Sequence, residues 1–122
     1  GTLDPLATGL LIICTGKMTK QIDTFQGMDK VYVGQMKLGA TTPSFDKETE
    51  EDNQFTIDDI LENDLLKTAK KFLGEIDQIP PIYSAIKIDG KRAYEYARKK
   101  EHREIKPRKV IIHDFNLLNI DL

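Results

Sequence analysis

The sequence opens with Gly1-Thr2-Leu3-Asp4-Pro5-Leu6-Ala7-Thr8-Gly9 and continues into the apolar run Leu10-Leu11-Ile12-Ile13-Cys14. Because Pro5 disfavours the helical region for the residue before it, Asp4 is predicted to lie in an extended or turn conformation. Gly9 follows at a point where the backbone can turn tightly or let another group approach closely. The pattern therefore presents a carboxylate beside an apolar wall. From these residues alone, two interpretations stay open: a reactive acid, or an ordinary Asp-Pro turn whose aspartate caps the next element.

Length, charge and cysteine content narrow the class of protein. The chain has 122 residues, of which 39% are hydrophobic, and a formal net charge of −2, as expected for one soluble globular domain. No apolar run approaches the length of a membrane span, and no signal segment is recognisable. Cys14 is the only cysteine, which rules out an intrachain disulfide and favours a reducing, cytoplasmic location. The chain starts without methionine and inside a motif, so we expect a fragment of a longer protein.

Several common catalytic and cofactor patterns do not fit the sequence. A phosphate-binding loop G-x-x-x-x-G-K-[ST] is excluded, since Leu11 stands at its first glycine and Met18 at its hydroxyl position. Ser84 has no His-Asp partners near it in the sequence, and His102 and His113 have no cysteine or histidine cluster around them. We therefore expect no metal, nucleotide or redox cofactor.

Hydrophobic periodicity predicts both helices and strands, and thus an α+β chain. The apolar run over residues 9–15 predicts a buried strand or a buried helical turn. Residues 19–25 are predicted to form a short helix that ends at Gly27. Residues 30–38 alternate as a strand does and place Tyr32 on the apolar face. On that face the tyrosine ring can be a core side chain or the wall of a site.

The second half of the chain is predicted to hold the clearest helix. A capping-box pattern over residues 56–59 opens this helix, and Gly74 ends it. Asp89-Gly90 predicts a hairpin turn, and residues 92–100 predict a short helix after it. Residues 110–122 are partly apolar on both faces, which predicts a strand inside a sheet.

Charge is unevenly distributed along the chain. Acidic residues dominate the stretch 46–64, which predicts a solvated loop kept away from any phosphate backbone. Between residues 87 and 109 basic residues outnumber acidic ones, and Tyr83, Tyr94 and Tyr96 lie within or beside this basic segment. Clustered positive charge with interleaved aromatic residues is typical of a nucleic-acid-binding surface. A solvated helix with ordinary surface lysines is the alternative.

Three blocks of the sequence match one family pattern in the expected order. The first is the opening stretch, which reads G-x-L-D-P-x-A-x-G-x-L. The second consists of Lys30-Val31-Tyr32, as K-x-Y, and Leu38-Gly39-Ala40-Thr41-Thr42, as L-G-x-x-T. The third is QIPPIYSAIK at residues 78–87, as Q-x-P-P-x-Y-S-A-x-K, with GKRAYEYAR at 90–98, as G-x-x-x-Y-x-x-A-R. Together they resemble the bacterial tRNA pseudouridine-55 synthases, and the Tyr-Ser-Ala form separates them from relatives that work with guide RNAs.

The resemblance implies the isomerisation of a uridine in the T-loop of tRNA, at position 55, to pseudouridine. It assigns to Asp4 the role of nucleophile, and to Tyr32 stacking on the flipped-out base and assistance in removing the C5 proton. A base must leave the stack before an enzyme can do chemistry on it, and one carboxylate in a dry pocket can act as the nucleophile. Attack at the base and attack at the sugar both stay open. No cofactor is implied.

The resemblance also implies a fold and an RNA-binding surface. Residues 1–122 are expected to form part of a pseudouridine synthase catalytic domain, an α+β fold whose mixed, largely antiparallel sheet is flanked by helices. Residues from about 80 to 109 resemble a basic, thumb-like hairpin-helix insertion that grips the T-arm of tRNA. No membrane and no obligate protein partner are expected. The residues expected to contact the RNA are Tyr83, Lys87, Lys91, Arg92, Tyr94, Arg98 and Lys99.

The resemblance covers only part of the family domain. The family has a segment before Gly1 and a later K-G-T-Y-I-R block whose arginine pairs with the catalytic aspartate, and neither is in this sequence. We therefore expect the chain alone to be weakly active or inactive. Residues 42–46, TPSFD, also depart from the usual T-x-T-x-D. A module that binds structured RNA without chemistry is the alternative function.

Overall fold

The computed structural model describes residues 2–82, 87–88, 91–92 and 105–122. The predicted turn at Asp89-Gly90 and the body of the predicted helix, residues 93–100, lie outside these residues. The chain divides into two compact units, residues 1–37 and 38–122. The described residues contain two α-helices, one 3-10 helix and three antiparallel pairs of short strands. This confirms the predicted α+β class, whereas the single mixed sheet is not formed among these residues.

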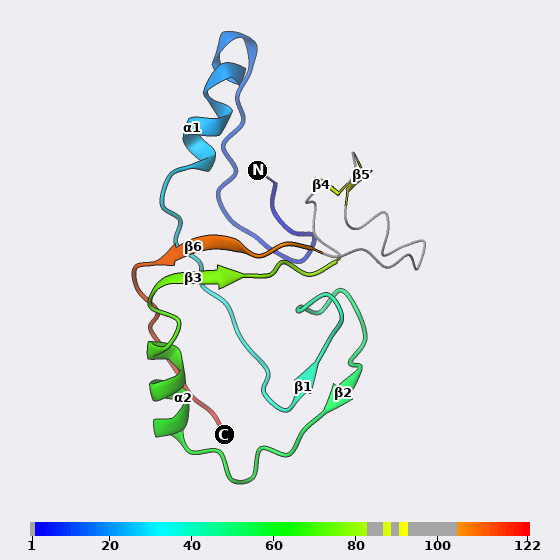
Figure 1. Cartoon of the computed structure of the whole chain (residues 1–122), viewed down its shortest axis with the longest axis vertical. Helices are drawn as coiled ribbons and strands as arrows, with labels where there is room; N and C mark the ends of the chain where they lie inside the picture. Colours follow the sequence, from blue (N-terminus) through cyan, green and yellow to red (C-terminus); the bar gives the residue numbers. More distant parts are fainter. Residues whose placement is uncertain (1, 83–86, 89–90, 93–104) are drawn as a thin grey trace. The chain divides into compact units, whose positions relative to one another are not determined.

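The first unit reverses its direction at a short helical segment. The 3-10 helix η1 (Gly16–Gln21) continues directly into helix α1 (Ile22–Gln26), as Figure 1 shows. Gly16 has a φ of 56°, a left-handed conformation that glycine adopts without strain. The amide of Gly27 donates to the Asp23 carbonyl oxygen and ends the helix. The predicted helix over residues 19–25 and its end at Gly27 are therefore confirmed.

Two strand predictions in the first unit are wrong. Residues 9–15 form neither a strand nor an α-helix, and the predicted strand over residues 30–38 has no regular structure. Leu10 and Val31 keep 87% and 94% of their surface exposed. A strand needs a neighbour that pairs its backbone groups and a layer that covers its apolar face. The described part of the chain supplies neither to these segments, so an apolar alternation alone does not make them strands.

Helix α2 (Glu62–Lys70) is the longest helix of the described residues, and its N-cap, Leu61, lies five residues after the Thr56 cap that the sequence suggested. The Asp64 carboxylate accepts a hydrogen bond from the Leu61 amide at 3.1 Å, which satisfies a donor at the helix start. Residues 57–60 instead form a separate turn, in which the Ile60 amide donates to the Ile57 carbonyl oxygen. The capping pattern at residues 56–59 was therefore assigned to the wrong element.

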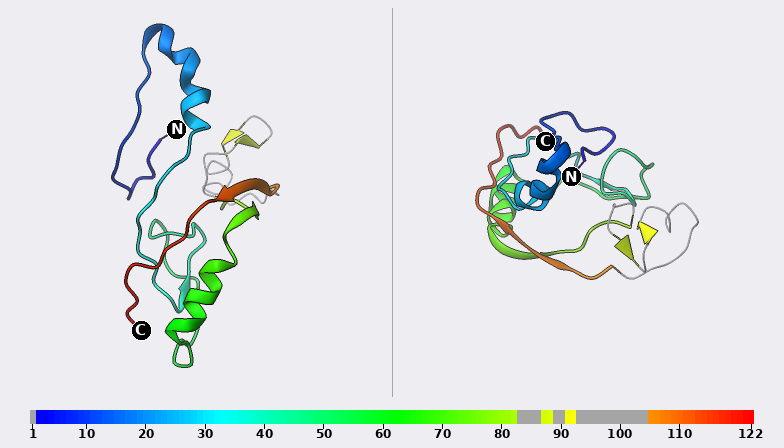
Figure 2. Two further views of the ribbon diagram at one scale, coloured as in Figure 1. Left: turned by 90° about the vertical axis from the view of Figure 1, so that its left-hand side faces the viewer. Right: turned by 90° about the horizontal axis from the view of Figure 1, so that it is seen from above.

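The strands β3 (Gly74–Gln78) and β6 (Arg108–Ile112) form the longest ladder of the second unit. They pair antiparallel from Gly74 opposite Ile112 to Gln78 opposite Arg108. Helix α2 leads into β3 through a short connection (Figures 1 and 2). The ring of Phe72 in this connection packs edge-on against Phe115 beyond β6, with centroids 6.1 Å apart and planes at 86°.

The β3–β6 ribbon has one half-buried face and one exposed face. Ile76, Val110 and Ile112 share the half-buried face, whereas Ile111 on the other face is 61% exposed. The predicted strand over residues 110–122 ends at Ile112, and it pairs only with β3 among the described residues. The prediction of a strand inside a wider sheet is therefore wrong, since one of its two apolar faces lies open to solvent.

Two shorter pairs complete the described strands. β1 (Ala40–Thr41) pairs antiparallel with β2 (Asn53–Gln54). β4 (Lys87–Ile88) pairs antiparallel with β5 (Lys91–Arg92), which agrees with the predicted hairpin. Arg92 consequently belongs to a strand and does not begin a helix.

Candidate functional site

Asp4 lies at the first position of a turn whose second residue is Pro5. The turn is closed by the Ala7 amide, which donates to the Asp4 carbonyl oxygen with an N···O distance of 2.9 Å. Aspartate at the first position and proline at the second are both favoured in type I turns, because proline presets φ. The predicted turn conformation is confirmed. The Asp4 side chain is exposed.

The apolar residues around Asp4 do not enclose it. Gly9 has a φ of 153°, and a Cβ built there would lie 4.0 Å from Leu3 Cδ2, so the loop folds back on Leu3. Leu3, Leu6 and Leu10 are nevertheless all exposed. The water-excluding wall that the sequence suggested is therefore open to solvent in the described part of the first unit.

Tyr32 is 83% exposed in a segment without regular secondary structure. A tyrosine with that exposure is not a core side chain, and its ring is accessible to a planar partner. Lys30, two residues earlier, donates through Nζ to the carbonyl oxygens of Gln26 at 2.6 Å and Met28 at 2.9 Å. This lysine thus binds carbonyl groups at the end of α1, where positive charge is favourable. The K-x-Y pair therefore combines a structural lysine with an accessible ring.

Gly39, in the L-G-x-x-T turn, lies at a position that strongly favours glycine. Its φ is 85°, and a Cβ built there would lie 3.1 Å from both Ile57 Cγ2 and the Phe55 carbonyl oxygen. Its own carbonyl oxygen accepts the Phe55 amide at 2.8 Å. The backbone of the turn consequently runs directly against the chain after β2, and a side chain at this position would require these neighbours to shift.

Side-chain hydrogen bonds add to the backbone pairing of β1 and β2. The Thr41 hydroxyl donates to Asp52 Oδ1 at 2.6 Å, and Asn53 Nδ2 donates to Thr41 Oγ1 at 3.3 Å. The hydrogen bond from Thr41 is the main cause that holds the pKa of Asp52 below its usual value. Asp52 is therefore a structural carboxylate within the acidic stretch.

The loop between β1 and β2 is closed by a polar network around Ser44, whose residue surface is only 5% exposed. The Ser44 hydroxyl donates to Asp46 Oδ1 at 2.7 Å, and Asp46 Oδ1 also accepts the Glu48 amide at 2.8 Å. Because the single hydroxyl proton of Ser44 goes to Asp46, the Thr49 hydroxyl, 2.7 Å away, donates to Ser44. Thr42 Oγ1 donates to the Asp46 carbonyl oxygen at 2.7 Å.

Sequence reasoning missed this network. Thr42, Ser44 and Asp46 occupy the positions of T-x-T-x-D, and serine keeps the hydroxyl that the middle threonine would supply. The hydroxyl spacing was the available signal, since a buried hydroxyl in a loop needs a partner within that loop. The acidic stretch is mostly exposed, as predicted, but several of its carboxylates accept hydrogen bonds from the chain, namely Asp46, Asp52, Asp58 and Asp64.

The expected RNA-binding residues are only partly described. Lys87, Lys91 and Arg92 lie in the β4–β5 pair, and the register places Lys87 directly opposite Arg92. Tyr83, Tyr94, Arg98 and Lys99 lie outside the described residues.

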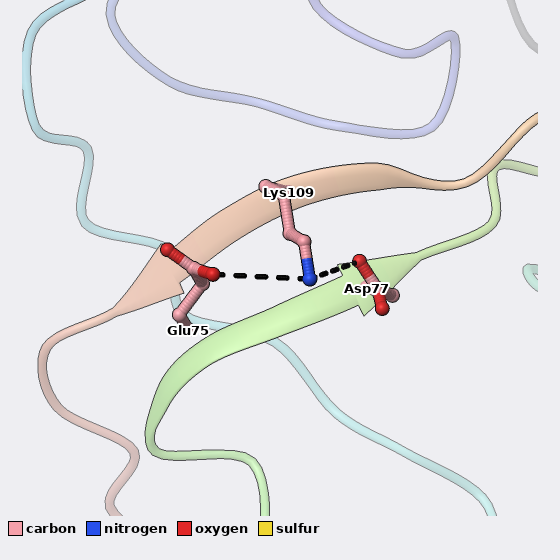
Figure 3. Close-up of polar contacts among 3 residues, drawn as sticks. All are labelled: Glu75, Asp77 and Lys109. Atoms are coloured by element: carbon pink, nitrogen blue, oxygen red, sulfur yellow. Dashed lines mark ion pairs between the residues drawn. The ribbon is translucent and has the colours of Figure 1, made fainter.

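The cations at the end of the basic segment are bonded to β3. Arg108 Nε donates to Gln78 Oε1 at 2.6 Å. Lys109 Nζ lies 2.9 Å from Asp77 Oδ1 and 3.8 Å from Glu75 Oε1 (Figure 3). The charge of Lys109 is therefore already compensated by two carboxylates.

The part of the chain that the structure describes contains no candidate metal site. Within it, no three His, Cys, Asp or Glu side chains are grouped so that they could hold a metal ion. No helix there has the length and apolarity needed to cross a membrane. Cys14 is a free, half-buried thiol.

The elements above define an α+β chain with an exposed Asp-Pro turn in one unit and a basic hairpin in the other. Over residues 1–122 it matches the TruB family pseudouridylate synthase (N terminal domain). The chain belongs to this family.

Individual relatives match along the whole chain. A protein of Flavobacterium johnsoniae named tRNA pseudouridine synthase B is 58% identical over 122 residues, which are 100% of this chain and 53% of the relative. The proteins of the same name from Bacteroides fragilis and Chlorobium chlorochromatii are 52% and 46% identical, again over 100% of this chain and over 52% and 48% of their own lengths. The chain spans about half the length of the curated relatives it matches.

Proposed function

We propose that the protein carrying this chain isomerises a uridine in the T-loop of tRNA, at position 55, to pseudouridine. Family membership over residues 1–122 and the shared name of the relatives support this proposal. The observation that carries it is the geometry of Asp4, whose backbone is fixed by a proline turn while its carboxylate stays exposed. Such a group can meet an extruded nucleotide without first breaking bonds within its own loop.

Asp4 is proposed to be the nucleophile on a flipped-out uridine. Attack by its carboxylate, at the base or at the sugar, accompanies a pathway in which the bond from ribose C1′ to N1 breaks. The base then rotates, and C5 forms the new bond to C1′. The C5 proton is lost and N1 gains a proton, so atoms and electrons balance without an oxidant, a reductant or a cofactor. Flipping is required because the reacting atoms are inaccessible in the stack.

Tyr32 is proposed to stack on the extruded base and to assist removal of the C5 proton. Its ring is accessible, and it belongs to the same unit as Asp4. Stacking of a splayed base on an aromatic ring is a common way for proteins to hold single-stranded RNA, and it stabilises the bound base by about 1–3 kcal/mol.

The RNA-binding surface is proposed to be the basic insertion from about residue 80 to 109. In the β4–β5 pair, Lys87 lies directly opposite Arg92. The register therefore brings two basic residues of this insertion to neighbouring positions on paired strands. The proposed contacts to the T-arm are Tyr83, Lys87, Lys91, Arg92, Tyr94, Arg98 and Lys99.

The complete catalytic domain is proposed to need protein segments besides those described. The exposed apolar side chains around Asp4 and the greater length of the relatives support this proposal. In such a domain the short antiparallel pairs belong to a larger mixed sheet, and residues that cover Leu3, Leu6 and Leu10 keep water from Asp4. The chain by itself is accordingly proposed to be weakly active or inactive.

The proposed location is the cytoplasm.

The function is tested with a T-arm RNA that carries tritium at C5 of its uridines. Release of tritium by the full-length protein is expected, because the C5 proton leaves during isomerisation. If a folded protein binds this RNA and releases no tritium, the proposal is wrong, and a structured-RNA-binding module without chemistry takes its place.

A further inference from the structure

The basic insertion begins and ends at one end of the β3–β6 ribbon. The last pair of this ladder is Gln78 opposite Arg108, and residues 79–107 connect the two. The separation and direction of the two chain segments at this pair therefore fix where the insertion starts and ends.

Prolines prevent the ladder from extending further. If the register continued, the next pairs would be Ile79 with Pro107 and Pro80 with Lys106. Proline has no amide hydrogen, so it cannot donate to a ladder. Pro80 is also buried. The base of the insertion is thus a defined position and not a sliding one.

Side chains cross-link the last two pairs of the ladder on opposite faces. On the half-buried face, Arg108 Nε donates to Gln78 Oε1 at 2.6 Å. On the exposed face, Lys109 Nζ lies 2.9 Å from Asp77 Oδ1, the residue directly opposite it (Figure 3). Directly opposite pairs of this kind stabilise antiparallel strands. The four residues Asp77, Gln78, Arg108 and Lys109 are named the base clamp below.

We propose that the base clamp positions the insertion for RNA binding, and that Lys109 is a positioning residue and not a phosphate contact. The inference rests on the proposed function. Lys109 has a second carboxylate, Glu75 Oε1, at 3.8 Å. A phosphate group would have to displace Asp77 and approach two negative charges. Fixing the two ends of the insertion at one place reduces the ordering that binding must otherwise bring about.

The two possible roles of Lys109 predict opposite effects of Asp77→Asn. If the lysine belongs to the clamp, the variant loosens the base and weakens binding of a T-arm RNA by about two- to five-fold, the range of exposed ion pairs. If Lys109 contacts a phosphate, the same variant releases the lysine and tightens binding. Dissociation constants of the full-length protein, measured by fluorescence anisotropy, separate the two.

Salt dependence and charge reversal give two further measurements. Lys109→Gln is expected to weaken binding while the slope of log K against log salt stays unchanged, because no phosphate contact is lost. Loss of one contact would lower that slope by about 0.7–0.9.

The double variant Asp77→Lys, Lys109→Asp restores the pair with reversed charges and is expected to restore the affinity. Its kcat for tritium release stays that of the parent, while the single variants raise KM only.

Lys70→Gln, on helix α2, is the matched control for loss of one surface lysine, and thermal unfolding checks that each variant is folded. The inference is overturned by tighter binding of Asp77→Asn or by a lower salt slope for Lys109→Gln. It is also overturned if every clamp variant binds the RNA with the affinity of the parent. If the unmodified protein does not bind the RNA, the proposed function and the inference fail together. If the parent binds and isomerises the RNA normally and the clamp variants have unchanged affinity, the inference fails while the proposed function stands.

Discussion

The loop of Asp4 and the loop of Ser44 both present an aspartate on a short irregular segment, but they use it differently. Asp46 accepts hydrogen bonds from the Ser44 hydroxyl and the Glu48 amide, so its carboxylate is used within its own loop. Among the described residues, the Asp4 loop is closed by a backbone hydrogen bond, and its carboxylate is left exposed. An aspartate that its own loop does not need is available for chemistry, whereas Asp46 is bound to the structure around it.

The comparison extends to the units that hold the two loops. In the second unit, Gly39, Ser44 and Thr41 make close local contacts that the nearby sequence supplies. In the first unit, apolar residues such as Leu10 and Val31 are exposed. Single local substitutions are therefore expected to change the stability of the Ser44 loop. The apolar residues around Asp4 are instead expected to need covering groups from elsewhere in the protein.

The largest effect on stability is expected for Gly39→Val. A β-branched residue at a φ of 85° is strained, and its Cβ would lie 3.1 Å from Ile57 Cγ2 and from the Phe55 carbonyl oxygen. We expect a loss of at least about 2 kcal/mol in the free energy of unfolding, measured in urea. Gly34→Val is the control in the first unit, because nothing lies within 4 Å of a Cβ there. Equal losses in both variants would remove the distinction between the units.

An intermediate effect is expected for Ser44→Ala. The variant removes the donor to Asp46 and the acceptor of the Thr49 hydroxyl at a site with 5% exposure. We expect a loss of about 1–3 kcal/mol in the free energy of unfolding. Thr56→Ala is the matched control, since its hydroxyl bonds to Asp58 on the exposed surface, where a loss of about 0.5 kcal/mol or less is expected. Similar losses for the two variants would show that burial of the network contributes nothing.

The smallest effect concerns the response of the β1–β2 pair to acid. The Thr41 hydroxyl lowers the pKa of Asp52 in the folded state. The hydrogen bond between Thr41 and the Asp52 carboxylate therefore contributes fully to stability above the ordinary aspartate pKa. This contribution is lost as the pH falls through the lowered pKa of Asp52. Thr41→Val removes the hydroxyl, so the pKa of Asp52 should rise toward its ordinary value in an NMR titration. An unchanged titration of Asp52 in that variant would contradict the assignment of the cause.

Sequence reasoning succeeded where structure is set by neighbouring residues. The turn at Asp4, the helix that ends at Gly27 and the β4–β5 pairing all depend on proline, glycine or alternation within a few positions. It failed where a partner distant in sequence decides. Residues 30–38 alternate as a strand does, but a strand forms only with a neighbour that pairs its backbone groups.

The predicted start of helix α2 was wrong for a different reason. Two segments, residues 56–59 and 61–64, both offer an acidic side chain that can cap a helix. The second is used, through Asp64 and the Leu61 amide, because residues 57–60 form a turn of their own. A local pattern cannot rank two such candidates, and element ends are consequently its weakest prediction.

The central claim is that the exposed carboxylate of Asp4 is the nucleophile. Its most direct test compares the full-length protein with its Asp4→Ala variant on a T-arm RNA labelled with tritium at C5, with RNA affinity measured on the same preparations. The account predicts that the variant binds the RNA as the parent does, while tritium release falls by about 10⁴-fold or more. Release by the variant at a rate near that of the parent would contradict the account.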